Sequence, residues 1–200
     1  MNPFLILFLH GVGADAASFQ GLAQALAPGL PQAQLLVPDG FQPFDGGGAG
    51  RQWFSLRGVT DANRPARVRA AAEEVSRYAD AELARRGLAG DRLVVVGFSQ
   101  GAIVAAWLAL HRRPAPAAVV LLSGRVAEEA APVAGAVATP VLVAHGAQDP
   151  VMPVALAEAS ARTLTAWGAR VTTRLYPGLG HEVSAQELRD VQAFLATALR

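Results

Sequence analysis

The fold is decided by the stretch LVVVGFSQGAIVAAWLAL, residues 93–110. Its first four residues are apolar, as in a strand that is buried on both faces. Residues 102–110 are almost wholly apolar and rich in alanine and leucine, which predicts a buried helix. Between them, Gly97-Phe98-Ser99-Gln100-Gly101 matches G-x-S-x-G and places Ser99 at a strand-to-helix turn. This is the setting of a nucleophile elbow, although a serine that merely caps the helix is the alternative.

Composition limits the classes of protein that this chain can represent. With 200 residues, of which 52% are hydrophobic and 16% charged, residues 1–200 are expected to form a single globular domain with a sizeable core. A formal charge of +1 gives no basic footprint for nucleic acid. Cysteine is absent, which excludes disulfides, thiolate metal sites and a cysteine nucleophile.

The apolar run at residues 4–9 lacks a basic flank and is too short for a signal peptide or a membrane span. We therefore expect a cytoplasmic protein without an integral membrane segment.

Six apolar segments alternate with helical patterns along the chain. Strands are expected at residues 4–9, 35–37, 93–96, 118–122, 141–144 and 171–176. Helices are expected at residues 18–27, 64–86, 102–110, 154–167 and 184–199, the last capped by Ser184. This alternation predicts an α/β fold, a mostly parallel six-stranded sheet with helices on both faces. A glycine-rich loop is expected at residues 39–63, and the short loop at 123–139 leaves little room for a cap domain.

A serine nucleophile needs a base that is oriented by a third group. Of the four histidines, His181 lies in a glycine-flanked loop after the last strand, from which its side chain can reach the elbow. His10 and His145 each precede a glycine at a strand end, where we expect them to brace loops, and His111 ends the elbow helix. The sequence therefore favours His181 as the base.

The acid is expected between Ser99 and His181 in the chain. Asp149 follows the fifth strand and fits, although it could instead cap the helix after Pro150. Glu128 and Glu129 lie one loop earlier and are poorer candidates.

An oxyanion hole requires two N–H donors. The backbone N–H of Gln100 is expected to be one of them, and that of Val12, in the loop after the first strand, the other.

Several motifs together resemble the carboxylesterase/phospholipase family, which includes small bacterial serine esterases and acyl-protein thioesterases. They are His10-Gly11-Val12-Gly13-Ala14, Trp53-Phe54, Gly97-Phe98-Ser99-Gln100-Gly101, His145-Gly146-x-x-Asp149-Pro150 and Gly180-His181. The resemblance covers nearly the whole chain, with the motifs in the family's order. This chain departs from the thioesterases in its single Gly97 before Phe98, in Ala102 where a further glycine is usual, and in its loop at residues 41–58.

The resemblance implies the α/β-hydrolase fold, a triad of Ser99, Asp149 and His181, and oxyanion donors at Val12 and Gln100. It also implies cleavage of a small-molecule carboxylic ester with a short-to-medium acyl chain, through an acyl-enzyme on Ser99. A thioester or a lysophospholipid could be cleaved in the same way, and neither a metal nor an organic cofactor is required. Trp53 and Phe54 are candidates for the wall of the acyl site, with packing in the core as the alternative.

Two other classes of function compete with this interpretation. Residues 11–16, GVGADA, also match G-x-G-x-x-A after a first strand, and Asp39 stands where an acid could bind ribose. A dinucleotide-binding module using Gly11 and Gly13 would leave Ser99 and His181 without a role. The second alternative, a hydrolase-fold binding protein without turnover, disagrees with the presence of all three triad residue types.

Overall fold

The computed structural model describes residues 3–127 and 138–199. Six strands form one sheet in the order β2-β1-β5-β6-β7-β8, and all neighbouring pairs are parallel. The strands are β1 (Phe4–Leu9), β2 (Ala33–Leu36), β5 (Leu93–Phe98), β6 (Ala118–Leu122), β7 (Pro140–Gly146) and β8 (Arg170–Tyr176). The predicted strands are all present, with β2 beginning two residues earlier than expected.

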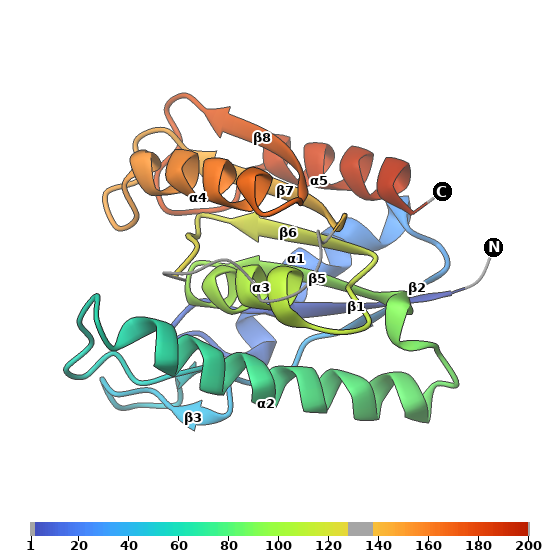
Figure 1. Ribbon diagram of the computed structural model, residues 1–200, viewed down its shortest axis with the longest axis horizontal. Coiled ribbons are helices and arrows are strands. Elements are labelled where there is room, and N and C mark those ends of the chain that lie inside the picture. Colours follow the sequence, from blue (N-terminus) through green and yellow to red (C-terminus); the bar gives the residue numbers. More distant parts are fainter. Residues whose placement is uncertain (1–2, 128–137, 200) are drawn as a thin grey trace.

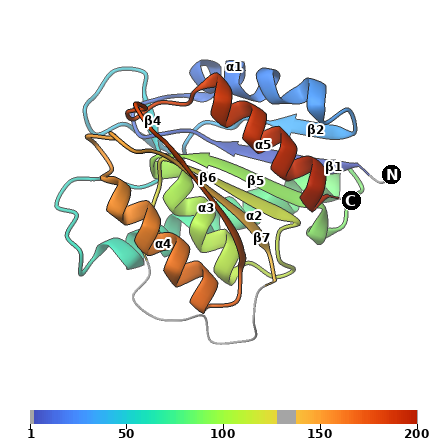
Figure 2. The same ribbon diagram turned by 90° about the horizontal axis from the view of Figure 1, so that it is seen from above.

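In the part of the chain that the structure describes, five α-helices cover the two faces of this sheet (Figures 1 and 2). They are α1 (Ala16–Leu26), α2 (Arg64–Arg85), α3 (Gln100–His111), α4 (Val154–Ala166) and α5 (Ala185–Ala198). Figure 2 shows α1 and α5 on one face, with α2, α3 and α4 on the other. Two short 3₁₀ helices, η1 (Ala27–Gly29) and η2 (Gly90–Arg92), occur in the connections. In the described residues, each helix is too short or too polar to span a bilayer.

Strand β5 has a continuous apolar sequence because both of its faces are covered. Leu93 and Val95 pack in the core on the side of α2, α3 and α4. Val94 and Val96 alternate with them and pack in the core on the side of α1 and α5. Each such side chain contributes about 1.5–3 kcal/mol when fully buried. Residues 93–98 thus form an inner strand of the sheet, between β1 and β6.

The strand order reverses between β1 and β5. Strand β2 lies on one side of β1, whereas β5 and the strands that follow it in the chain lie on the other side. In open α/β sheets, the crevice beyond the carboxyl ends of the strands at such a reversal is where ligands bind. Gly11 follows β1 and Ser99 follows β5, so both lie at this crevice.

The long loop before α2 is more ordered than its glycine content suggests. It contains a small antiparallel hairpin of β3 (Gln42–Pro43) and β4 (Arg51–Gln52), which lies below α2 in Figure 1. No separate cap domain occurs within residues 3–127 and 138–199. Part of the loop predicted at 123–139, residues 128–137, lies outside the described residues, as do Glu128 and Glu129.

Helix α5 begins with the predicted cap. The Ser184 side chain accepts a hydrogen bond from the Glu187 N–H, and the Glu187 carboxylate accepts one from the Ser184 N–H. Glu187 is fully buried, and its Oε1 has no hydrogen-bond partner among the described residues. Burial therefore raises the pKa of Glu187 to about 7, against the opposing effect of the hydrogen bonds with Ser184.

The raised pKa of Glu187 predicts a loss of stability as pH rises. Between the ordinary pKa of 4.5 and about 7, the folded protein holds a proton that the unfolded chain has lost. Relative to Glu187→Gln, which does not titrate, the wild type should lose about 3 kcal/mol of unfolding free energy between pH 5 and pH 8. Urea unfolding at both pH values measures this difference. The exposed Glu158→Gln serves as control, and a constant difference between wild type and Glu187→Gln would contradict the prediction.

Candidate active site

Ser99 occupies a strained backbone position between β5 and α3. Its φ of 52° and ψ of −116° lie outside the usual regions for a residue with a side chain. The flanking glycines make this turn possible: a Cβ on Gly97 would lie 2.4 Å from the Gly101 carbonyl oxygen, and a Cβ on Gly101 would lie 2.0 Å from that of Leu9. The Ser99 side chain makes no capping hydrogen bond to α3. The helix-cap alternative therefore does not describe this serine.

The structure brings Ser99, His181 and Asp149 together from three separate loops. The Ser99 Oγ lies 2.9 Å from His181 Nε2, and His181 Nδ1 lies 2.6 Å from Asp149 Oδ2. Asp149 follows β7 and His181 follows β8, so the three groups meet at the carboxyl edge of the sheet. A neutral imidazole with its proton on Nδ1 donates to Asp149 and presents a free lone pair to the serine hydroxyl. This arrangement can remove the proton of an attacking serine.

Asp149 is held by the loop that it begins. Its Oδ1 accepts hydrogen bonds from the N–H groups of Val151 (2.9 Å) and Met152 (2.8 Å). Burial alone would raise the pKa of Asp149, but the hydrogen bonds from Met152, His181 and Val151 outweigh it, so the pKa lies below its usual range. Helix α4 has Pro153, not Asp149, at its N-cap. The carboxylate therefore stays charged and faces His181.

The other histidines lie outside the chain of contacts from Ser99 to Asp149, although His145 Nε2 is 3.5 Å from Asp149 Oδ2. His10 donates through Nδ1 to the Gly11 carbonyl (2.7 Å) and accepts at Nε2 from the Gly40 N–H (2.8 Å). Burial lowers the pKa of His10, which keeps this ring neutral. His145 is also buried and donates to the Met152 carbonyl at 2.7 Å. Both brace loops, as predicted. His111 stacks on a tryptophan at the opposite end of α3 from Ser99.

A cavity of about 490 Å³ opens beside Ser99 and His181. Its other lining residues are mostly apolar or small: Gly11, Val12, Ala14, Ser18, Phe19, Phe98, Val151, Glu182 and Val183. Val12 was expected at this crevice from the sequence, whereas the rest of this wall was not. Phe98 could have been found, because the residue before the serine in an elbow lies at the crevice. Phe19 and Val183 could not, because they come from segments far apart in the chain.

Trp53 and Phe54 do not line the cavity at Ser99. Their exposed fractions are 1% and 3%, and both belong to the core on the side of α2 and α3. A role of either residue in the acyl site therefore stays a prediction. Of the two alternatives, packing in the core is the one that their positions support. Trp53 and Phe54 belong to a loop, but that loop folds back onto the sheet, so both side chains are buried.

The features that suggested a dinucleotide site have other uses. The Asp39 carboxylate accepts a hydrogen bond from the Ala16 N–H at 2.7 Å, at the start of α1. The Gly13 N–H donates to the Arg51 carbonyl at 2.8 Å, and a Cβ on Gly50 would lie 2.5 Å from the Gly13 carbonyl oxygen. The hairpin thus covers the glycine turn that a pyrophosphate would need. Within the described residues, no group of three histidine or acidic side chains is placed to hold a metal ion.

A serine on a strand-to-helix elbow, followed along the chain by an aspartate and a histidine at later strand ends, is characteristic of the α/β-hydrolases. The chain belongs to the phospholipase/carboxylesterase family, whose model matches residues 3–199. It is similar to Esterase YpfH of Escherichia coli (strain K12), with 32% identity over 188 residues, 92% of this chain and 78% of that protein.

Two further similarities agree with this assignment. Acyl-protein thioesterase 1 of Gibberella zeae is 33% identical over 119 residues, which are 56% of this chain and 51% of that protein. The crystal structure of esterase PE8 matches with a TM-score of 0.85 and 26% identity, over 98% of this chain and 93% of the other. The chain is therefore an esterase-type hydrolase.

Proposed function

We propose that this protein hydrolyses carboxylic esters with short-to-medium acyl chains through an acyl-enzyme on Ser99. The observation that carries the proposal is the continuous chain of hydrogen-bonding distances from Ser99 Oγ through His181 to Asp149. Nucleophile, base and orienting acid are the three parts that such a reaction needs. Their low exposure, 7% for Ser99 and 6% for Asp149, limits competition by water.

In the proposed mechanism, Ser99 Oγ attacks the ester carbonyl while His181 Nε2 accepts its proton. Asp149 stabilises the imidazolium that results. The tetrahedral oxyanion accepts hydrogen bonds from the backbone N–H groups of Val12 and Gln100, and each such donor is worth about 3 kcal/mol. His181 then protonates the leaving alcohol, and a water molecule, activated by the same imidazole, releases the acid.

The cavity supports a neutral substrate of modest size. Its wall is formed largely by Phe19, Phe98, Val151 and Val183, and its volume is about 490 Å³. Among the described residues that line it, Glu182 is the one with a carboxylate side chain. An apolar wall suits an acyl chain, and an acidic rim disfavours an anionic leaving group. A thioesterase or lysophospholipase with the same mechanism is the second candidate, favoured by the similarity to acyl-protein thioesterase 1.

A chain-length series separates these candidates. We expect kcat/KM for p-nitrophenyl esters to be highest between acetate and octanoate and to fall for palmitate, because the cavity is short and open. Acyl thioesters of the same chain lengths, with neutral and with anionic thiols, are assayed in parallel. Higher kcat/KM for long-chain thioesters or lysophospholipids than for any short ester would contradict the proposed substrate and favour the second candidate.

A further inference from the structure

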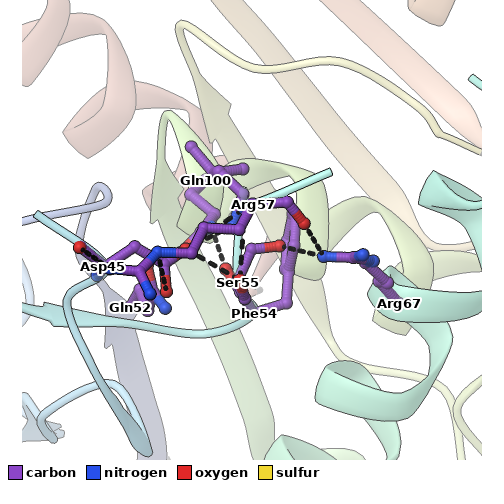
Figure 3. Close-up of polar contacts among 8 residues, drawn as sticks. Asp45, Gln52, Phe54, Ser55, Arg57, Arg67 and Gln100 are labelled. Atoms are coloured by element: carbon purple, nitrogen blue, oxygen red, sulfur yellow. Dashed lines mark hydrogen bonds and ion pairs between the residues drawn. The ribbon is translucent and has the colours of Figure 1, made fainter. Parts of the chain in front are cut away.

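The side chain of Gln100 reaches from the first residue of α3 to the loop before α2. Its exposed fraction is 3%. Its Oε1 accepts a hydrogen bond from the Trp53 N–H at 2.8 Å. Its Nε2 donates to the Phe54 carbonyl, also at 2.8 Å (Figure 3). One amide thus pairs with one backbone donor and one backbone acceptor in adjacent residues. The elbow helix is thereby fastened to a segment nearly fifty residues earlier in the chain.

The segment that Gln100 holds is fastened on its other side to the end of β1. The Trp53 Nε1–H donates to the His10 carbonyl at 2.8 Å, and the two rings lie 5.1 Å apart. Two backbone hydrogen bonds of 2.8 Å continue this attachment, from the Gly13 N–H to the Arg51 carbonyl and from the Arg51 N–H to the Ala14 carbonyl. The loop therefore forms a bridge between the turn after β1 and the start of α3.

The two ends of this bridge are the backbone segments that carry the proposed oxyanion donors, Val12 and Gln100. We propose that the Gln100 side chain is a positioning residue of the oxyanion hole. By holding Trp53 and Phe54, it fixes the backbone N–H of its own residue relative to that of Val12. This inference rests on the proposed hydrolysis at Ser99. It gives the Gln100 side chain a positioning role, in addition to the proposed role of the Gln100 backbone N–H as an oxyanion donor.

Precise placement matters because the donors act on a charge that exists only in the transition state. They must lie about 2.7–3.1 Å from the oxyanion, and removal of one donor costs about 10²–10³ in kcat. A displaced donor should cost less than a missing one. Interactions that strengthen only in the transition state affect kcat and leave KM nearly unchanged.

The chain offers a matched control in Gln52. It is also a buried glutamine, 1% exposed, and its Oε1 accepts from the Asp45 N–H at 3.2 Å within the same loop (Figure 3). Its side chain bonds within the hairpin loop, away from the start of α3. Gln100→Met leaves two buried backbone groups without their side-chain partner, and Gln52→Met leaves one partly buried N–H, so both should lower the unfolding temperature.

Steady-state kinetics with a p-nitrophenyl ester tests the proposal. Gln100→Met should lower kcat by about 10- to 100-fold with KM changed by less than about threefold, whereas Gln52→Met should keep kcat within about twofold. An aryl trifluoromethyl ketone, whose adduct with serine carries an oxyanion, provides a second readout. Its inhibition constant should rise for Gln100→Met by about the same factor as kcat falls.

Trp53→Phe interrupts the same bridge at its other end, since it removes the donor to the His10 carbonyl and keeps a ring. Trp53→Phe should also lower kcat. It replaces Gln100→Met as the test variant if Gln100→Met does not fold. Unchanged kcat in Gln100→Met, or an equal loss in Gln52→Met, would overturn the inference. A wild type no faster than Ser99→Ala would overturn the proposed function and this inference with it.

Discussion

Replacement of Ser99 by alanine is expected to lower kcat for p-nitrophenyl esters by about 10⁴-fold or more. In the proposed mechanism the Ser99 Oγ is the atom that forms the acyl-enzyme, so alanine removes the nucleophile. The fold should tolerate the change, because the side chain makes no capping hydrogen bond to α3. Substrate binding should be largely kept. Initial rates over a range of ester concentrations, with a thermal melt of the same preparation, measure both expectations.

Ser123 provides the matched control for this experiment. It is the other non-glycine residue with positive φ among the described residues, at 49°, and it follows the neighbouring strand β6. It is fully buried, and its Oγ has no hydrogen-bond partner among those residues. Ser123→Ala should keep kcat within about threefold, because in the part of the chain that the structure describes the hydroxyl makes no hydrogen bond to the proposed triad. Near-wild-type activity in Ser99→Ala would overturn the assignment of the nucleophile.

Replacement of Gly101 by alanine should have the second large effect, on folding. A Cβ at this position would lie 2.0 Å from the carbonyl oxygen of Leu9 and 2.8 Å from that of His10. Both are backbone atoms of β1 and of the turn after it, so neither can move aside cheaply. We expect the free energy of unfolding to fall by about 3 kcal/mol or more, as in severe overpacking. Urea unfolding followed by circular dichroism measures the loss.

The same substitution at Gly21 should act in the opposite direction. Gly21 lies inside α1 and is exposed, and a Cβ there would meet no atom within 4 Å. Gly21→Ala should raise the free energy of unfolding by about 0.5–1 kcal/mol, because alanine loses less backbone entropy in a helix. Equal stability of Gly101→Ala and the wild type would contradict the account of the elbow.

The sheet and its helices could be predicted from the sequence because their patterns are local. The four apolar residues before Gly97 predict a strand covered on both faces, and β5 is that strand. The pairing of Ser184 with Glu187 predicts the start of α5. The positions of Asp149 and His181 at strand ends followed from the topology, since parallel strands bring their carboxyl ends to one edge.

The loop before α2 could not be predicted, because its structure depends on contacts distant in sequence. Trp53 is fixed by Gln100 and His10, each more than forty residues away. Ala102 stands where a glycine is usual in the thioesterases, and its methyl group is also accommodated by a residue distant in sequence. A Cβ on Gly124 would lie 2.3 Å from the Ala102 methyl group, so the glycine after β6 leaves room for it. Composition gives no sign of either pairing.

The central claim, that Ser99 is the nucleophile, is tested most directly by covalent labelling. The wild type is treated with a fluorophosphonate, digested, and the modified peptide is identified by mass spectrometry. We predict a single adduct on Ser99, with loss of esterase activity in proportion to labelling, and no adduct in Ser99→Ala. An adduct on another residue, or full activity in protein labelled at Ser99, would contradict the account.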